Sequence, residues 1–319
     1  MIQKTSLASR GRVLLTGGSG FVGRAAIEPL RKAGFEVHAV GRHAFETPAD
    51  VNWHSVNLLD EVEMRRLVDA VEPSHLLHFA WYAEPGKYWT AAENFDWLRA
   101  SVALLQAFSE RGGRRVVMAG TCAEYDWNYG SYAEAATPLV PATPYGACKN
   151  ALHDVLAAFS RQFGLSSAWG RIFFPYGPHE HPSRLIPSVI CALLEGLPAL
   201  CTSGEQVRDF IHVHDVAGAF AALLDSKVEG AVNIASGRGV AVKDIALQIG
   251  ERLGRPDLVR LGARPAPQGE PPIMVADVRR LEQEVGWRST IGLEHGLATT
   301  IDWWRTQLSR QLAGKGILT

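Results

Sequence analysis

The sequence predicts an α/β fold: a doubly wound parallel sheet over residues 1–174, followed by a smaller and less regular domain over residues 175–319. Two observations carry this prediction. Apolar, strand-like segments alternate with helix-like segments through the first 174 residues, as they do in parallel sheets built from repeated βα units. Beyond Phe174 the alternation gives way to segments punctuated by proline, which is typical of short elements and loops. We expect residues 211–236 to return to the first sheet.

The first unit of the alternation contains a glycine-rich turn. A strand-like segment (13–15) leads into Thr-Gly-Gly-Ser-Gly-Phe-Val-Gly (16–23), which is followed by a helix-like segment (24–33) and a second strand-like segment (35–40). This is the first half of a Rossmann-like dinucleotide-binding unit, read with glycines at 18, 20 and 23 or at 17, 20 and 23. The glycines let backbone N–H groups approach a pyrophosphate at the positive end of the helix. A glycine turn without a ligand is the alternative.

The next units follow in order along the chain. They pair a helix with the strand after it: 61–71 with 75–80, 95–111 with 115–119, and 145–163 with 167–173. In the C-terminal half we expect one further strand at 232–235 and a helix at 242–253. Ligands of doubly wound sheets bind beyond the carboxyl ends of the strands. The loops after Ala80, Ala119 and Phe173 are therefore expected to surround one ligand.

Composition and charge exclude several classes of function. Of the 319 residues, 47% are hydrophobic and 20% are charged, as in ordinary globular proteins. A net charge of −1 offers no attraction to nucleic acid or to an anionic membrane. No apolar run approaches the ~20 residues of a membrane span, and residues 1–12 lack an apolar signal core. The four cysteines show neither the density of a disulfide scaffold nor the CxxC spacing of a metal site. We therefore expect a cytoplasmic protein without a bound metal.

Two side chains at the start of the long helix expected at residues 145–163 have the spacing of a catalytic pair. Tyr145 and Lys149 are four residues apart and share one helix face, while Thr143 and Pro144 suit the cap and the first helical position. A Lys ammonium beside a phenol favours the phenolate and lowers the tyrosine pKa, which suits proton transfer at neutral pH. Thr121, just beyond the preceding strand, is placed to reach the same cleft. Taken alone, such a pair also occurs on the surface of ordinary amphipathic helices.

Seven short motifs lie along nearly the whole chain. They are residues 16–23, 78–80, 121–125, 145–149, 176–178, 208–213 and 233–237. In this order they resemble the motifs of the extended short-chain dehydrogenase/reductases, in the NAD-dependent epimerase/dehydratase family, whose members act on nucleotide sugars. The resemblance implies a Rossmann-like NAD(P)-binding domain before residue 175 and a nucleotide-sugar substrate domain after it.

The resemblance also implies roles for particular polar residues. Tyr145 would exchange a proton with the sugar oxygen while hydride moves between the sugar carbon and the nicotinamide. Lys149 would hold the nicotinamide ribose and tune Tyr145, and Thr121 would hydrogen-bond the same sugar oxygen. Arg208 would pair with the pyrophosphate of the nucleotide sugar, because its fork binds phosphates bidentately, and Arg184 is a second candidate for substrate binding. For Arg208, a salt bridge that locks the domain is the alternative.

A cofactor site is implied as well. Its residues are Gly17, Ser19, Gly20, Phe21, Val22, Gly23, Arg42, Asn57, Leu58, Phe79, Ala80, Trp81, Tyr145, Lys149 and Phe173. Relatives that prefer NAD carry an acidic residue at the end of the second strand, where this chain has Gly41 and Arg42. Because Arg42 suits a 2′-phosphate, we predict NADP as the cofactor, with NAD as the alternative. A solvated surface arginine would leave that preference without support.

The chain departs from the family at positions that decide the reaction. Dehydratases follow the catalytic Thr with Asp-Glu, where this chain has Cys122 and Ala123, so 4,6-dehydration loses its acid–base pair. In relatives resembling GDP-fucose synthase, a Cys two residues past the catalytic hydroxyl and a downstream His exchange protons at sugar carbons. Ala123 and Arg184 stand at or near those two positions here. Cys122, one place away, is expected to be a small buried residue. Direct reduction of a carbonyl or oxidation of an alcohol is therefore the reaction that we expect.

Further departures concern the substrate. Phe174 and Trp97 stand where the family often carries Asn. The insertion at residues 81–89 is unusually aromatic. It forms either a stacking wall for a base or sugar ring or a packed lid without ligand contact, and both interpretations stay open. Residues 179–181, His-Glu-His, have no third ligand nearby in the sequence, so a polar loop is expected rather than a metal site.

We therefore predict an NADP-dependent reductase of a nucleotide-diphospho-keto-sugar, a 4-ketoreductase with Tyr145 as the proton donor. A nucleotide-sugar 4-epimerase that retains NAD is one alternative, and a nucleotide-binding regulatory protein without turnover is another. In this family two long helices from each subunit commonly form a dimer interface. The helices expected at 95–111 and 145–163 are the candidates here, so we predict a homodimer. Neither nucleic acid nor a membrane is expected as a partner.

Overall fold

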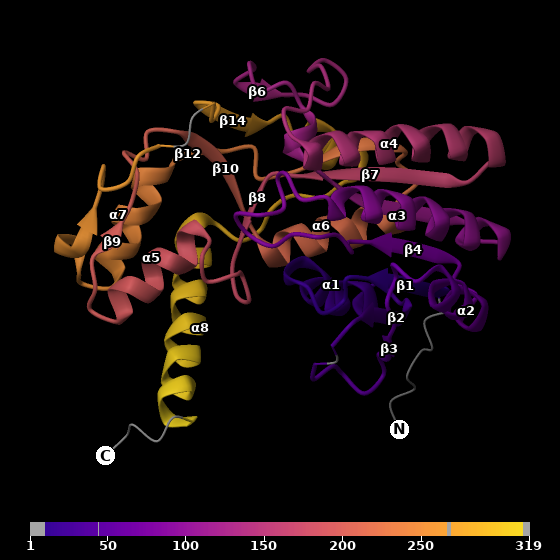
Figure 1. Ribbon diagram of the computed structural model, residues 1–319, viewed down its shortest axis with the longest axis horizontal. Helices are drawn as coiled ribbons and strands as arrows, with labels where there is room; N and C mark the ends of the chain where they lie inside the picture. The colour runs from indigo at the N-terminus through magenta and orange to yellow at the C-terminus, as the bar shows by residue number, and fades with distance from the viewer. Residues whose placement is uncertain (1–9, 44, 267–268, 315–319) are drawn as a thin grey trace.

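A seven-stranded parallel sheet is the largest sheet in this computed structural model, which describes residues 10–43, 45–266 and 269–314 (Figure 1). The strands lie in the order β11-β7-β5-β4-β1-β2-β3, and every neighbouring pair is parallel. Their bounds are β1 (Arg12–Thr16), β2 (Glu36–Gly41), β3 (Asn52–Ser55), β4 (His75–His78), β5 (Arg115–Thr121), β7 (Ser166–Ile172) and β11 (Gly230–Ile234). The order reverses between β1 and β4, as in doubly wound sheets. The predicted α/β fold is confirmed.

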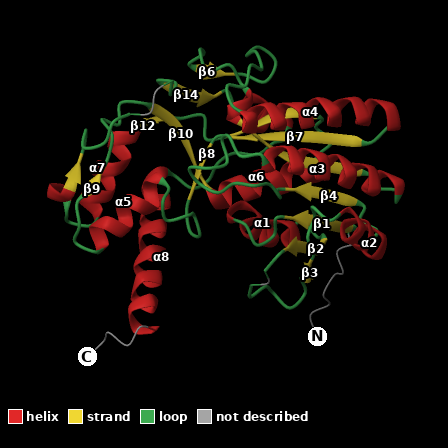
Figure 2. Ribbon diagram, viewed as in Figure 1, coloured by secondary structure: helices red, strands yellow, loops and turns green. Residues whose placement is uncertain are grey.

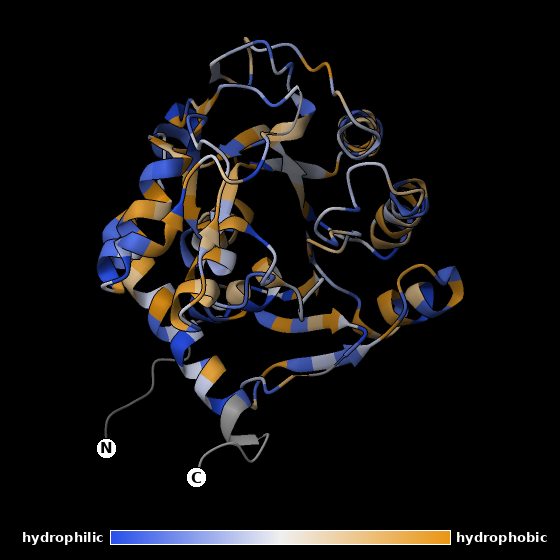
Figure 3. Ribbon diagram, turned by 60° about the vertical axis from the view of Figure 1, so that its left-hand side comes forward, coloured by the Kyte–Doolittle hydropathy of each residue, from blue (hydrophilic) through white to orange (hydrophobic). Residues whose placement is uncertain are grey.

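Helices cover both faces of this sheet (Figure 2). One face carries α1 (Phe21–Lys32) and α6 (Val213–Asp225), and the other carries α2 (Glu61–Val71), α3 (Glu93–Glu110) and α4 (Pro144–Phe163). The helices show hydrophilic and hydrophobic residues in turn along their length (Figure 3), as expected when one side meets a core and the other meets solvent.

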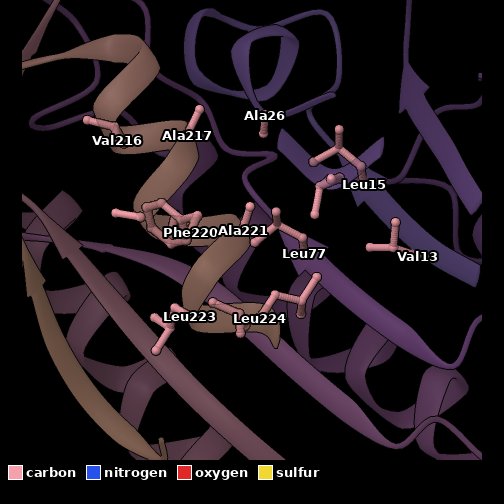
Figure 4. Packing of buried hydrophobic residues seen from close by; sticks show 14 of the residues in the cluster. Val13, Leu15, Ala26, Leu77, Val216, Ala217, Phe220, Ala221, Leu223 and Leu224 are labelled. Carbon is pink, nitrogen blue, oxygen red and sulfur yellow. The ribbon is translucent and has the colours of Figure 1, made fainter. Parts of the chain in front are cut away.

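Two hydrophobic cores result from the alternation of side chains along the strands. Val13 and Leu15 of β1 pack into the core under α1 and α6, whereas Leu14 packs into the core under α2, α3 and α4. Figure 4 shows the first of these cores, to which Leu77 of β4 and Ala221 of α6 both belong. The strands are therefore buried on both faces, which explains why they read as continuous apolar runs.

A second lobe lies beyond the carboxyl ends of these strands (Figure 1). Its sheet has the order β12-β10-β14-β6, and β8 pairs with β10. Its strands are β6 (Ser131–Tyr132), β8 (Phe174–Tyr176), β10 (Val207–His212), β12 (Gly239–Ala241) and β14 (Ile273–Ala276), with a separate pair β9 (Ala199–Leu200) and β13 (Val259–Arg260). Its helices are α5 (Leu185–Leu194), α7 (Val242–Arg252) and α8 (Leu293–Gly314). Ile190, Ile249 and Ile301 join these three helices in one core. Short helical turns lie at Cys122–Glu124, Pro256–Leu258 and Arg280–Glu284.

The segment 211–236 divides between the two sheets. Helix α6 packs beside α1, and β11 pairs with β7 at the edge of the large sheet, as expected. Ile211 and His212, however, end β10 in the second sheet, where they pair with Pro175 and Tyr176 of β8. The chain therefore crosses back to the large sheet only where α6 begins.

In the described part of the chain, none of the helices is long and apolar enough to cross a bilayer. Most of the polar N-terminal segment considered above, residues 1–9, lies outside the described residues.

Candidate active site

The glycine turn between β1 and α1 has the shape of an anion cradle. Gly17 has φ +70°, and a Cβ on it would lie 2.9 Å from the backbone nitrogen of Ala80. A Cβ on Gly23 would overlap the carbonyl oxygen of Gly17. Glycine alone permits this closeness. Gly20 precedes α1 without a side-chain cap, so the first N–H groups of the helix remain available to an anion at its positive end.

The end of β2 leans against this turn. A Cβ on Gly41 would lie 2.6 Å from Ser19 Oγ and 2.9 Å from the ring of Trp53, so the strand ends in glycine and offers no carboxylate there. Arg42 follows as an exposed residue and forms no ion pair with any residue of the described ranges. The structure therefore leaves the Arg42 side chain exposed, one residue beyond the point where β2 meets Ser19 of the turn.

Thr121 and Tyr145 meet, as the sequence predicts. Thr121 ends β5 and is buried, and its hydroxyl is hydrogen-bonded to the phenol of Tyr145. Thr143 caps α4 by accepting a hydrogen bond from the N–H of Gly146 at 3.2 Å, and Pro144 is the first helical residue. Because this cap fixes the start of α4 at Pro144, Tyr145 lies in the first turn of the helix, where its side chain reaches Thr121 at the end of β5.

Lys149 lies one turn further along α4 and is buried. Its Nζ donates to the carbonyl of Ala119 at 2.9 Å and lies 3.8 Å from the ring centroid of Trp81. Burial lowers the pKa of Lys149 to about 7 and raises the pKa of Tyr145 above its usual value. The expectation that Lys149 lowers the pKa of Tyr145 is wrong for this structure, because desolvation of the phenol dominates.

Sequence reasoning missed Glu124, which holds Thr121 in place. Its side chain is fully buried and accepts from the N–H of Thr121 at 2.7 Å, from Trp169 Nε1 at 3.0 Å and from Arg171 Nε at 2.6 Å. Removing one partner of such a buried pair leaves an uncompensated charge. The Thr-x-x-Glu spacing of a capping box is the local signal that could have found it.

The aromatic insertion at residues 81–89 is packed down onto the catalytic candidates. The indole N–H of Trp81 donates to Asn94 Oδ1 at 2.8 Å, and Asn94 Nδ2 donates to the carbonyl of Tyr88 at 2.7 Å. The N–H of Tyr145 donates to the carbonyl of Trp89 at 3.1 Å, and the Tyr88 and Tyr145 rings lie 4.8 Å apart, edge to face. Of the two interpretations of this insertion, the packed lid agrees with these contacts. Asn94, fully buried, was also missed.

The loop after β8 approaches the same lid. Arg184 precedes α5, lies 5.5 Å from the ring centroid of Tyr88 and is hydrogen-bonded to its hydroxyl. Glu180 is buried, with one carboxyl oxygen that has no partner in the described structure, and burial raises its pKa to about 8. Glu180, at the centre of the polar loop expected at residues 179–181, is therefore buried rather than exposed to solvent.

Arg208 is buried in β10 and forms a salt bridge. Its guanidinium donates to Glu270 at 2.8 Å, donates to the carbonyl of Val207 at 2.9 Å and lies 5.4 Å from the ring centroid of Phe174. The pair with Glu270 agrees with the alternative considered for Arg208, a salt bridge that locks the domain. A phosphate reaches Arg208 only by displacing or joining Glu270.

The remaining predicted cofactor residues follow the carboxyl ends of the strands. Asn57 and Leu58 follow β3, Phe79 and Ala80 follow β4, and Phe173 follows β7, while Phe21 and Val22 open α1. All of them lie at one edge of the sheet, where doubly wound folds bind ligands. Within residues 10–43, 45–266 and 269–314, no cluster of three His, Cys, Asp or Glu side chains is arranged to hold a metal ion.

Comparisons of the sequence with known proteins find relatives along most of the chain. The family model described as the NAD dependent epimerase/dehydratase family matches residues 13–235. Among curated proteins, UDP-glucose 4-epimerase of Azospirillum brasilense is 28% identical, over 97% of this chain and 96% of its own length.

Solved structures agree over almost the full length. UDP-glucose 4-epimerase of Thermus thermophilus in complex with NAD has a TM-score of 0.81 and 28% identity, covering 92% of this chain and 99% of that chain. MoeE5 in complex with UDP-glucose and NAD has a TM-score of 0.82 and 30% identity, covering 93% of this chain and 100% of that chain. This chain is similar to each of them in fold along both lobes.

Proposed function

The chain belongs to the NAD dependent epimerase/dehydratase family, and from this premise we propose that it is an NADP-dependent reductase of a nucleotide-diphospho-keto-sugar, acting at C4. The observation that carries the proposal is the hydrogen bond between Thr121 and a Tyr145 phenol that burial keeps protonated. Reduction of a carbonyl to an alcohol needs one proton at the oxygen. A tyrosine that holds its proton at neutral pH is suited to supply it.

The chain's residues fit a dinucleotide. The glycine turn, which tolerates no Cβ at Gly17 or Gly23, and the uncapped start of α1 would hold its pyrophosphate. Lys149 would hold the nicotinamide ribose. When bound, the reduced nicotinamide supplies the hydride. NADP is our proposal rather than NAD because Gly41 offers no carboxylate to the adenosine ribose and Arg42 follows it.

The proton chemistry falls to three side chains. The Tyr145 hydroxyl donates its proton to the C4 oxygen as that oxygen gains negative charge, and Thr121 donates a hydrogen bond to the same oxygen. Lys149 lies one helical turn away, where its ammonium form stabilises the phenolate left on Tyr145. Burial raises the pKa of Cys122 to about 12, so its thiol stays protonated and is a poor base.

The nucleotide diphosphate is assigned to two arginines. Arg184 lies at the lid beside Tyr88, and Arg208 lies in β10, with Glu270 as its present partner. Both are the residue type that binds pyrophosphate bidentately. The relatives named UDP-glucose 4-epimerase and the neighbour in complex with UDP-glucose support a nucleotide sugar as the substrate class.

A nucleotide-sugar 4-epimerase is the second candidate, because several relatives carry that name. Mixing the protein with NADPH and a panel of nucleotide 4-keto-sugars, while following the absorbance of the reduced nicotinamide, separates the two. A reductase consumes NADPH in proportion to product. An epimerase leaves NADPH unconsumed in that assay and, in a second assay with nucleotide sugars that carry a C4 hydroxyl, interconverts the two C4 epimers. A protein that binds the dinucleotide but turns over no sugar in either assay is the regulatory alternative.

A further inference from the structure

A pocket beside the glycine turn has no role in the site described so far. Its volume is about 400 Å³, and it lies between α1, the loop after β2, the loop after β8 and the start of α6. The lining residues are Phe21, Arg24, Ala25, Phe45, Glu46, Pro178, His179, Val213 and His214. Only Phe21 among them belongs to the predicted cofactor site. Arg24 is the fixed positive charge of this lining.

The guanidinium of Arg24 is held in position without a counter-ion. One terminal nitrogen is hydrogen-bonded to His179 Nδ1 at 2.6 Å, the other donates to the carbonyl of Ser19 at 3.3 Å, and the group lies 4.5 Å from the ring centroid of Phe45. The Nε is buried and has no partner in the described structure. No acidic residue of the described ranges pairs with it, and burial lowers the pKa of Arg24.

His179, which is hydrogen-bonded to Arg24, has an unfavourable backbone conformation. Its φ is +70°, a left-handed conformation that non-glycine residues adopt rarely and that clusters at active sites, ligand clamps and switch regions. Burial lowers its pKa to about 4, so the ring is neutral and accepts from Arg24 rather than repelling it. The Trp303 ring of α8 also packs against the His179 ring, with centroids 4.6 Å apart and the planes tilted by 57°.

We propose that Arg24 binds a phosphate group of the dinucleotide. The pocket adjoins the start of α1, where the pyrophosphate is assigned, and the loop that follows Arg42, where the 2′-phosphate is assigned. Arg24 is already oriented by three contacts, whereas Arg42 is exposed. Glu46 lines the loop side of the pocket, so the phosphate lies on the α1 side, away from that carboxylate. The inference rests on the proposed dinucleotide binding but not on the sugar reaction.

Titration of NADPH and NADH by their fluorescence tests the inference in the full-length protein. A charge-assisted hydrogen bond contributes about 1.5–3 kcal/mol, so Arg24→Gln is expected to weaken binding by about ten- to a hundredfold. A loss confined to NADPH identifies the 2′-phosphate, and an equal loss for both cofactors identifies the pyrophosphate. Arg31→Gln is the matched control, because Arg31 lies on the same helix and is already paired with Glu28 and Asp50.

Wild-type affinity of Arg24→Gln for both cofactors overturns the inference and leaves the proposed function standing. Failure of the unmutated protein to bind either cofactor overturns both. Arg24→Lys separates a loss of binding from a folding defect, because lysine keeps the positive charge but lacks the paired N–H donors of the guanidinium. It is expected to fold like the wild type, by thermal unfolding without ligand, and to bind with intermediate affinity. Arg24→Lys with wild-type affinity would also count against a bidentate phosphate contact.

Discussion

Tyr145 and Lys149 lie one turn apart on α4, yet their surroundings push their protonation in opposite directions. Burial raises the pKa of Tyr145 and keeps its proton on. Burial also lowers the pKa of Lys149 to about 7, so only part of the lysine is charged at neutral pH. Bound phosphates would favour the ammonium form again. Cofactor binding and readiness for proton transfer are therefore linked through Lys149.

At Tyr145 the expected result of Tyr145→Phe is a loss of turnover of about 10²–10⁴-fold, the usual size of a general-acid contribution. The dinucleotide does not depend on the phenol proton, so its affinity should stay within a few-fold of wild type. Steady-state rates with the true substrate and NADPH titrations measure the two quantities. Near-normal turnover in Tyr145→Phe would remove Tyr145 from the proton-donor role.

Glu180 makes stability depend on pH. Its pKa is about 8 in the folded protein against 4.5 in the unfolded chain, so the unfolded state loses the proton first and the folded state is weakened as pH rises from 4.5 to 8. Glu180→Gln has no such charge. The free energy of unfolding of Glu180→Gln minus that of wild type should therefore increase by on the order of 3 kcal/mol when the pH is raised from 5 to 8.

Urea unfolding at the two pH values measures this difference. Glu195→Gln, at an exposed position after α5, is the control for loss of a carboxylate. Equal pH dependence of Glu180→Gln and wild type would show that the Glu180 carboxyl reaches solvent.

At the scale of elements, the lid at residues 81–89 touches both catalytic candidates. Trp81 covers the Nζ of Lys149 at 3.8 Å, and Tyr88 and Trp89 contact the Tyr145 ring. Asn94 ties the two ends of the lid together through Trp81 and Tyr88. The lid therefore takes part in orienting the site even where it touches no ligand.

The change Asn94→Ala is expected to lower the free energy of unfolding by about 2–4 kcal/mol, because it removes the hydrogen-bond partner of the Trp81 indole N–H and of the Tyr88 carbonyl. It should also lower kcat, since the lid no longer holds Tyr145. Asn128→Ala is the control, because Asn128 lies in an exposed turn and bonds only to Asp126 in the described structure. Equal stability and equal kcat of the two variants would show that the lid is held by other contacts.

At the scale of the whole molecule, the site depends on the junction of two lobes. The large sheet supplies the glycine turn, Thr121 and the start of α4 at its carboxyl edge. The second lobe supplies Arg184 and Arg208. Neither lobe alone carries both the proposed cofactor contacts and the proposed substrate contacts, so substrate binding requires the lobes to keep their relative placement.

We predict a homodimer from the exposed hydrophobic side chains on the outer faces of α3 and α4. Phe95, Val155 and Phe163 are exposed on these neighbouring helices at 61%, 37% and 62%, and a stable interface buries about 1,600 Å² in total. Val155→Arg should give the mass of one chain by light scattering at micromolar concentration, where wild type gives that of two. Val62→Arg, on the exposed face of α2, should leave the dimer intact. A wild-type mass of one chain contradicts the assignment.

Local pattern was enough to predict much of the fold. The helix at Glu61–Val71 was predicted to the residue, and the Tyr145 helix was predicted to within one residue of Pro144–Phe163. Both have strong caps, from Asp60 and Thr143, and a clear apolar period. The meeting of Thr121 with Tyr145 was predictable as well, because the carboxyl ends of parallel strands and the start of the following helix share one edge of the sheet.

The sequence by itself therefore determined the α/β sheet and the glycine turn, since both depend on periodicity and spacing within single βα units. It also singled out Thr121, Tyr145 and Lys149, through their spacing together with the resemblance to a known family. Only the tertiary structure decided that Glu180 is buried, that Arg208 pairs with Glu270 and that Arg24 faces a pocket without a counter-ion. The physical reason is that desolvation and charge pairing depend on which distant segments pack over a side chain. That packing is fixed by how the second lobe folds against the first, and no local pattern encodes it.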